Sequence, residues 1–265
     1  MNATPASGSV EGPAVTRAEY CVLACAEAWR DAGEVLASPM GTVPSIGARL
    51  ARLTFSPDLL LTDGAALLMG DVPAIGAEAE VVEGWLPYRQ HLALVATGRR
   101  HVMMGASQID RFGNQNISCI GEWSRPERQL LGVRGAPVNT ANNPTSYWVP
   151  RHSPRTFVER VDMVCGVGHD RAASAGPAAT RYHRIPEVIS DLGVFDFATA
   201  DRSMRLRSLH PGVTVEQVRE ATGFALAVTA DPADVPLTRE PTAAELRLIR
   251  EVIDPRGLRD REVRA

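Results

Sequence analysis

The chain has 265 residues, of which 45% are hydrophobic and 22% are charged, and its formal net charge is -3. This composition is typical of a soluble globular protein, and the lack of a basic surplus argues against a nucleic-acid partner. All of the positive charge is arginine, which excludes a lysine Schiff base and a P-loop lysine. No apolar run approaches the roughly 20 residues of a membrane helix, and the first residues lack signal-peptide features. We therefore expect a soluble, cytoplasmic protein with no membrane partner.

Helices and strands alternate along the first half of the chain, which is the order typical of a parallel α/β sheet. Residues 1–15 are rich in Gly, Pro, Ala and Ser and are predicted to be disordered. The capping box of Thr16 and Glu19 starts the first helix, and Gly33 is expected to end it. The further predicted elements are a strand at 34–37, a helix at 44–53, a strand at 58–61, a helix at 87–96 and a strand at 101–105, with an irregular stretch at 64–84.

The second half is predicted to add strands at one edge of the sheet and two more helices. The strands are expected at 129–133, 156–164, 185–190, 193–197 and 204–208, with a long polar loop at 139–144. Capping boxes start helices at Thr214 and Thr242, and the second helix ends before Pro255. Residues 254–265 form a charged tail that is expected to fray. No linker divides the chain, so residues 16–253 are predicted to form a single domain.

The stretch GASQIDRFGNQN at residues 105–116 follows the predicted buried strand and groups polar side chains around Gly113. Ligands bind at the carboxyl ends of strands in open α/β sheets, so a binding site is one interpretation. The alternative is a surface loop whose Asn and Asp side chains bond their own backbone. The polar residues concerned are Gln108, Asp110, Arg111, Asn114 and Asn116.

Several common chemistries lack their motifs in this sequence. No GxGxxG, GxxxxGK[ST] or GxSxG motif is present. Cys165 and His169 are four residues apart, but the two glycines between them favour a turn, so no metal site is expected. Cys21 and Cys25 lie one helical turn apart and are expected to face the core as small apolar residues. Arg134 could pair with a carboxylate or phosphate, and an exposed arginine is the alternative.

Four stretches together resemble the β subunit of family I coenzyme A transferases, of the glutaconate and 3-oxoacid type. They are LLLTDG (59–64), GASQIDRFGNQN (105–116), GVRGAPVN (132–139), and the pair SDLGVFDF (190–197) and HPGVTVEQVREATGF (210–224). The resemblance implies an α/β fold with an open, mostly parallel sheet and helices on both faces. It also implies a homologous α subunit, in an α2β2 heterotetramer. A coenzyme A thioester would bind as substrate where the subunits meet, with no permanently bound cofactor.

One position departs from the transferase pattern. In the transferases a Glu-Asn-Gly turn carries the glutamate that attacks the thioester, and here the matching residues are Thr62, Asp63 and Gly64. Threonine cannot form the glutamyl-CoA intermediate. The chain is therefore most similar to a branch without this glutamate, the ring-opening hydrolases of bacterial steroid and cholesterol catabolism. These cleave a carbon–carbon bond in a cyclic β-diketone of a CoA thioester by a retro-Claisen reaction.

The resemblance implies roles for three groups of residues. Thr62, Asp63 and Gly64 would lie near the reacting centre. The residues expected near the thioester or coenzyme A are Gly132, Arg134, Gly135, Ala136 and Asn139. Those expected to shape the loop are Gln108, Asp110, Gly113 and Asn114. This chain offers no obvious general base, so the base is expected from the α subunit. A true CoA transferase and a non-catalytic structural subunit remain the alternatives.

Overall fold

A six-stranded sheet organises the computed structural model, which describes residues 14–229 and 231–263. The strands, in their order across the sheet, are β1 (Leu36–Pro39), β5 (Arg100–Gly105), β10 (Thr145–Val149), β11 (Val188–Ser190), β12 (Gly193–Asp196) and β13 (Arg205–Leu209). The first four are parallel, and β12 and β13 continue the sheet in antiparallel pairing. The open, mostly parallel sheet and its added antiparallel strands are therefore confirmed.

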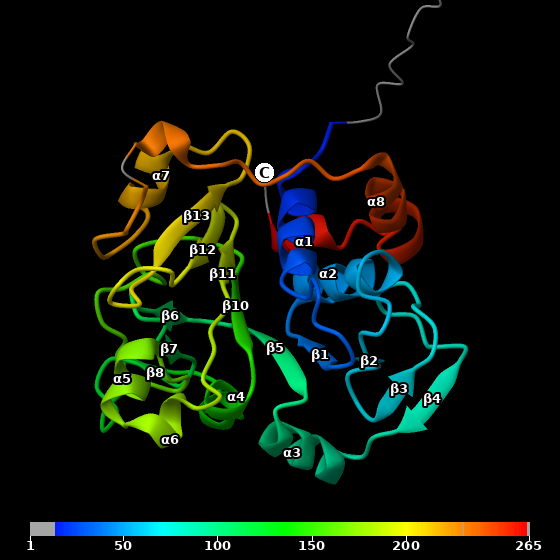
Figure 1. The fold of residues 1–265 in the computed structure, drawn as a ribbon, viewed down its shortest axis with the longest axis horizontal. Helices are drawn as coiled ribbons and strands as arrows, with labels where there is room; N and C mark the ends of the chain where they lie inside the picture. Colours follow the sequence, from blue (N-terminus) through cyan, green and yellow to red (C-terminus); the bar gives the residue numbers. More distant parts are fainter. Residues whose placement is uncertain (1–13, 230, 264–265) are drawn as a thin grey trace, which may run out of the picture.

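Helices lie on both sides of this sheet, with α1, α2 and α8 on one side and α4, α5 and α6 on the other (Figure 1). The helices are α1 (Arg17–Glu27), α2 (Thr42–Leu53), α3 (Tyr88–Thr97), α4 (Ala136–Asn142), α5 (His169–Ser174), α6 (Pro177–Thr180), α7 (Val215–Glu220), η1 (Pro232–Asp234), α8 (Ala243–Arg247), the π-helix η2 (Leu248–Ile253) and α9 (Arg259–Glu262). The two sides differ in kind: long helices cover the first, whereas loops and short helices cover most of the second.

Successive side chains of a strand point to opposite faces of the sheet, so the strands contribute to two separate cores. Met103 of β5 and Trp148 of β10 pack with α1 and α2. Their neighbours Val102 and Tyr147 point to the opposite face, where they pack with the loop residue Phe157 and with α7. Both cores share the same sheet, so the two sides of the molecule are held together through it.

In the part of the chain that the structure describes, three small antiparallel sheets lie around the main one. They are β2 (Leu61–Thr62), β3 (Leu67–Met69) and β4 (Val82–Trp85); β6 (Gln108–Ile109) with β7 (Gln115–Asn116); and β8 (Cys119–Ile120) with β9 (Arg128–Gln129). The expectation of an irregular stretch at 64–84 holds for residues 70–81, which form no helix or strand, and is wrong at residues 67–69 and from residue 82, where β3 and β4 lie. Neither strand alternates cleanly between buried and exposed residues: β4 is largely exposed, and in β3 only Met69 is buried.

The three helix starts that the capping boxes predict are confirmed. Thr16, Thr214 and Thr242 each cap a helix, and each capping box is complete, with the residue three positions on bonded back to the cap. The first helix nevertheless ends at Glu27, six residues before Gly33, because residues 28–31 continue as turns. Most of the stretch 1–15, for which disorder is predicted, lies outside the described residues.

Two predicted strands are wrong, and one central strand is absent from the predicted elements. Residues 130–133 form no strand, so that only Gln129 of the strand predicted at 129–133 lies in one, and residues 156–164 form no strand because they run as a loop across the second core. The additional strand is β10, whose residues are buried throughout although its sequence, TSYWV, begins with polar side chains. The expected polar loop at 139–144 is mostly α4 instead.

The C-terminal residues up to 263 do not fray. Helix α9 packs on α1 and α2, and Val263 is buried in the first core. Arg259 is itself buried, and its guanidinium bonds the carboxylates of Asp254, at 2.9 Å, and Glu19, at 3.2 Å. The expectation of a frayed tail is wrong for these residues, because Val263 and the ion pair of Arg259 with Asp254 are buried in the molecule.

Candidate functional site

The 105–116 loop is held in shape by its own side chains. Asp110 is buried, and its Oδ1 accepts the backbone N–H groups of Phe112 and Asn114, each at 3.0 Å. Burial raises the pKa of Asp110, and the bonds from Asn114 and from the backbone oppose that rise. Gly113 has φ of +81°, and a Cβ there would lie 2.8 Å from Ile185. The loop is thus a compact, internally bonded unit.

Gln108 ties the same loop to a distant segment. Its Nε2 donates to Asp162 at 2.9 Å, and its Oε1 accepts from Asn116 at 2.7 Å and from the backbone of Asp162 at 3.0 Å. These bonds use the polar atoms of the Gln108 side chain within the protein. Gln108 and Asp110 therefore present few polar atoms to a ligand.

Residues 132–135 present backbone groups at the surface instead. Gly132 and Arg134 both have positive φ, +82° and +51°, and they lead into α4. Within the described residues, no hydrogen bond is donated by the backbone N–H groups of residues 132–135. Arg134 is exposed, whereas Asn139 is buried and accepts a bond from Arg100 at 3.2 Å. This segment offers free N–H donors, the chemistry that stabilises an oxyanion.

Thr62 is the last residue of β2, and Asp63 and Gly64 begin the turn that leads to β3. Oδ1 of Asp63 accepts three backbone N–H groups, those of residues 65, 66 and 67, each at 2.9 Å. The bond from Leu67 is the main cause that lowers the pKa of Asp63. The hydroxyl of Thr62 accepts the N–H of Gly64 at 3.2 Å. A carboxylate engaged in this way shapes the turn and is a poor proton acceptor near neutral pH.

The chain brings two of the three predicted segments together and leaves the third apart. The segment Gly166–Gly168 joins the 105–116 loop to α4: the N–H of Gly168 donates to Asn114 at 2.8 Å, and that of Val167 to Thr140 at 3.0 Å. A Cβ on Gly168 would lie 2.6 Å from the backbone of residues 112 and 114. No hydrogen bond in the described part of the chain links Thr62–Gly64 to either segment.

An exposed apolar surface lies beside these segments. Helix α3 has no buried residue, and Trp85, Tyr88 and Leu92 are 70%, 77% and 57% exposed. α3 is joined to the end of α4 by a bond from Asn143 to the carbonyl of Val95, at 2.9 Å. We call the exposed side chains of Trp85, Tyr88, Leu92, Leu131 and Val138 the α3–α4 surface. Apolar patches of this kind mark binding partners in soluble proteins.

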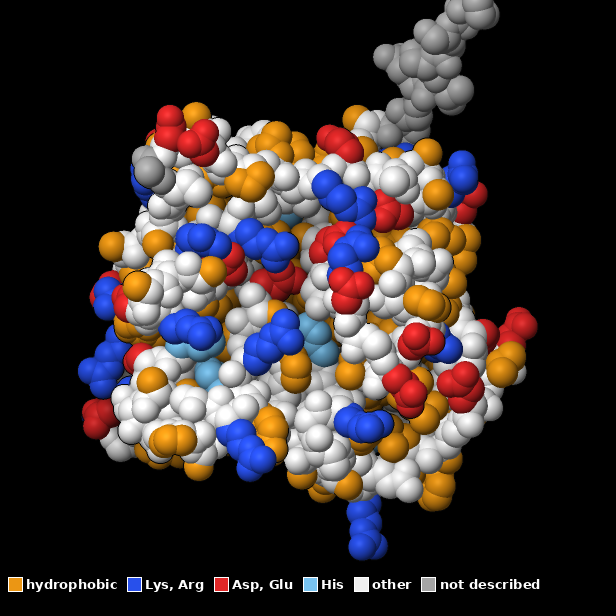
Figure 2. Space-filling model, viewed as in Figure 1, with side chains coloured by type: hydrophobic (Ala, Val, Ile, Leu, Met, Phe, Trp, Pro, Cys, Tyr) orange, Lys and Arg blue, Asp and Glu red, His pale blue; other side chains and the backbone are white. Residues whose placement is uncertain are grey.

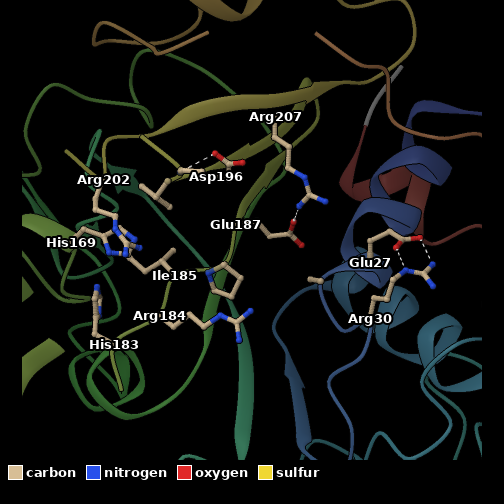
Figure 3. Close-up of a pocket in the computed structure, with 14 residues that line it drawn as sticks. Glu27, Arg30, His169, His183, Arg184, Ile185, Glu187, Asp196, Arg202 and Arg207 are labelled. Carbon is tan, nitrogen blue, oxygen red and sulfur yellow. Dashed lines mark hydrogen bonds and ion pairs between the residues drawn. The ribbon is translucent and has the colours of Figure 1, made fainter. Parts of the chain in front are cut away.

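A charged pocket of about 410 Å³ is a feature that the sequence motifs do not predict (Figure 3). It contains Glu187, which is 4% exposed and whose pKa burial raises to about 7. The one signal in the sequence is local: Glu187 is an ionisable residue within the apolar stretch 185–190, whose pattern otherwise predicts only a strand. The other lining residues come from positions as distant as Glu27 and Arg207, which no motif connects.

The described residues offer neither a metal site nor a membrane span. No group of three or more His, Cys, Asp or Glu side chains in residues 14–229 and 231–263 is placed to hold a metal ion. In the same residues, every helix is too short or too polar to cross a membrane.

Comparisons with known proteins identify the family to which the chain is similar. Residues 92–221 match the coenzyme A transferase family model. The chain is 59% identical to the cholesterol ring-cleaving hydrolase IpdB subunit of Rhodococcus jostii, over 94% of this chain and 96% of that protein. It is 32% identical to a 3-oxoadipate CoA-transferase subunit of Pseudomonas knackmussii, over 78% of this chain and 82% of that protein.

A solved structure agrees with the sequence relatives. The fold matches the crystal structure of IpdAB from Rhodococcus jostii RHA1 with a TM-score of 0.90 and 58% identity, over 95% of this chain and 99% of that one. The expected resemblance is thereby confirmed. The chain belongs to the coenzyme A transferase family, within the group formed by the IpdB subunits of cholesterol ring-cleaving hydrolases.

Proposed function

We infer that this chain is the β subunit of a heteromeric hydrolase that opens a ring of a coenzyme A thioester in bacterial steroid catabolism. The observation that carries this inference is the turn after β2. It holds Thr62 where a transferase needs its glutamate, and its only carboxylate, Asp63, is occupied by three backbone N–H groups. The high identity to IpdB subunits over nearly the whole chain supports the same assignment.

The proposed reaction needs a water nucleophile, a base and an anion-binding site. Water, deprotonated by the base, adds to a ring carbonyl, and the adjacent carbon–carbon bond breaks. The bonding electrons leave as an enolate that is then protonated, while the water oxygen stays in a new carboxylate. The thioester remains intact, so coenzyme A enters as part of the substrate and leaves attached to the product. It is not a permanently bound cofactor.

The free backbone N–H groups of residues 132–135 support a role as the anion-binding element. Gly132 and Gly135 let the backbone approach a ligand closely, and Ala136 begins α4 behind them. Arg134 extends from the same turn and can pair with a phosphate of coenzyme A. We propose that Asn139, bonded to Arg100, fixes the position of this turn.

An apolar cavity of about 380 Å³ beneath α3 fits the hydrocarbon part of such a substrate. Leu60 and Leu68 line it, and Leu68 is paired with Thr62 across the β2–β3 hairpin. Paired residues share one face of a hairpin, so the Thr62 side chain lies on the cavity's side. We propose that Thr62 contacts the ring, and that Gly64 allows the turn its positive φ of +85°.

We place the general base in the homologous partner subunit. Glu187 is a carboxyl with a pKa of about 7, which suits a base in principle. However, its pocket is not lined by Thr62, by Asp63 or by any residue of 132–139. Loss of all ring opening in a Glu187→Gln complex that still assembles would contradict this placement.

We propose that the partner covers the α3–α4 surface. This surface lies beside both the Thr62 turn and the 132–139 segment, which the chain alone does not join. A partner bound there would bring its base between them, in an α2β2 assembly.

We further propose that residues 16–253 form one domain, because both cores flank one sheet. We also propose that the complex is cytoplasmic.

The test uses the complex copurified with its partner, a cyclic diketo-CoA thioester and oxygen-18 water. Label in a new carboxylate, with coenzyme A still attached, is the expected result. Transfer of coenzyme A to an added free carboxylate, without ring opening, would instead identify a transferase, the activity named for the 32% identical relative. Full activity after substitution of both Gly132 and Thr62 would favour a non-catalytic subunit.

A further inference from the structure

The charged pocket lies at the amino ends of the parallel strands, away from the segments assigned above. The first residue of β10, Thr145, donates its N–H to the carbonyl of Arg184 at 3.0 Å, and Glu187 directly precedes β11. The end of α1, with Glu27 and Arg30, forms the opposite wall (Figure 3). None of the residues 62–64, 105–116 or 132–139 lines the pocket. It is therefore a separate feature of the fold.

Positive charge in this pocket is not fully compensated. Arg30 bonds Glu27, and Arg207 bonds Glu187 at 2.9 Å. The guanidinium groups of Arg184 and Arg202 form no ion pair or hydrogen bond with any residue of 14–229 and 231–263. Figure 2 shows arginine side chains and histidines gathered on this face of the molecule. Two arginines with free donors can bind an anion.

Glu187 supplies a second, independent sign of a ligand. Its side chain is 5% exposed and bonds Arg207 through Oε2, but its buried Oε1 has no partner in the described structure. A buried, unpaired oxygen is costly, so such atoms normally have a partner. The charged groups that face Glu187 are Arg207 of β13, Glu27 of α1 and Asp196 of β12. When protonated, Glu187 can donate a hydrogen bond to a bound anion.

Two histidines complete the lining on the other side. His169 and His183 meet edge to face, with ring centroids 5.0 Å apart, and His183 Nδ1 bonds the carbonyl of Thr140 at 2.8 Å. Burial lowers the pKa of both, that of His169 to about 4, and the charge of Arg202 lowers them further. Each Nε2 is buried without a partner in the described residues. Both rings are thus neutral near pH 7.

We propose that this pocket binds a small metabolite through an oxyanion, a phosphate or a carboxylate, which Arg184 and Arg202 contact and to which protonated Glu187 donates. Binding then requires the proton on Glu187, so the affinity falls as this group ionises. The proposal does not depend on the ring-opening activity, because it concerns binding at the other end of the sheet.

The experiment measures anion binding to the assembled complex by calorimetry. The probes are sulfate, which stands in for a phosphate and does not titrate near neutral pH, and malonate, which represents a carboxylate ligand. We expect the dissociation constant for the preferred probe to rise about tenfold from about pH 6 to pH 8. Tighter binding of sulfate identifies a phosphate-type ligand, and tighter binding of malonate a carboxylate-type ligand.

Variants separate this site from general charge effects. Arg184→Gln and Arg202→Asn should each weaken binding about tenfold or more, and asparagine suits the positive φ of residue 202. Glu187→Gln should bind with an affinity that no longer changes with pH. Arg181→Gln, which removes a charge outside the pocket, should bind like the unmodified complex. No binding of either anion, or unchanged binding by the Arg184 and Arg202 variants, would overturn the proposal.

Discussion

The two regions that carry the family's signature differ in how completely the chain builds them. The 105–116 loop is bonded to itself and to Gly166–Gly168, so its shape is fixed within the subunit. The β2–β3 turn and α3 instead stand at the surface, and α3 buries no side chain. The first region needs no partner for its geometry, whereas we propose that the second is completed by contact with the partner subunit. Folding and assembly therefore each supply one part of the proposed site.

The largest expected effect tests the preformed region. Gly168→Ala should lower the free energy of unfolding by about 4 kcal/mol, because a Cβ would lie 2.6 Å from the backbone of residues 112 and 114. Denaturant unfolding of the assembled complex measures it. The control is Gly105→Ala, whose Cβ would meet nothing closer than 4.0 Å. Equal, small effects of both substitutions would show that the loop adapts and is not preformed.

The next effect tests the open region. Leu92→Asp should weaken assembly with the partner more than about a hundredfold, or by about 3 kcal/mol, because a charge would be buried in the α3–α4 surface. The subunit itself should remain folded, since Leu92 is 57% exposed. Analytical ultracentrifugation of the two subunits measures assembly. Val252→Asp, at an exposed position on η2, is the matched control, and equal assembly of both variants would place the partner elsewhere.

A smaller effect concerns the pH dependence of stability that Glu187 of the charged pocket causes. The pKa of Glu187 is about 7 in the folded chain, above its ordinary value, because burial disfavours its charge. Its contribution to stability is therefore full below the unfolded pKa and is lost as pH rises through about 7. Relative to Glu187→Gln, the unmodified protein should lose about 2 kcal/mol between about pH 5 and pH 8, in buffer free of sulfate and phosphate.

The comparison with Glu187→Gln also removes the contribution of two buried histidines to the pH dependence. Burial lowers the pKa of His101 and His152 to about 3, so their contribution is lost in the opposite direction, as pH falls below their ordinary range. Both histidines are present in the two proteins, so the comparison cancels them. A difference in unfolding free energy that stays constant with pH would mean that Glu187 is ionised throughout.

The sequence predicts what is encoded locally and does not predict what the tertiary fold decides. The capping boxes at Thr16, Thr214 and Thr242 need only residues three positions apart, and all three are present. By contrast, Thr145 and Ser146 look like loop residues, yet they lie in a central strand because β5 and β11 flank them. Burial of these small polar side chains depends on neighbours that local periodicity does not report.

The candidate site divides in the same way. The turn at Thr62–Gly64 and the 132–139 segment are predictable because each is a short, continuous motif. The charged pocket is not, since Glu27, Glu187 and Arg207 come from three separate parts of the chain. Only the ionisable residue within the apolar stretch 185–190 indicates it. Sites assembled across the fold leave weak traces in sequence, even where burial shifts a pKa as far as it does at Glu187.

The smallest expected effect is on the turnover number of ring opening when Thr62 is substituted. Thr62→Ala removes a hydroxyl that accepts the N–H of Gly64, and it leaves the turn to the three bonds of Asp63. The turnover number should fall less than about tenfold, because a single neutral hydrogen bond contributes about 1 kcal/mol. Thr62→Val, which keeps the shape of the side chain, should match it. Complete loss of ring opening in an intact complex would instead make Thr62 part of the catalytic machinery, and the base would then not need to come from the partner.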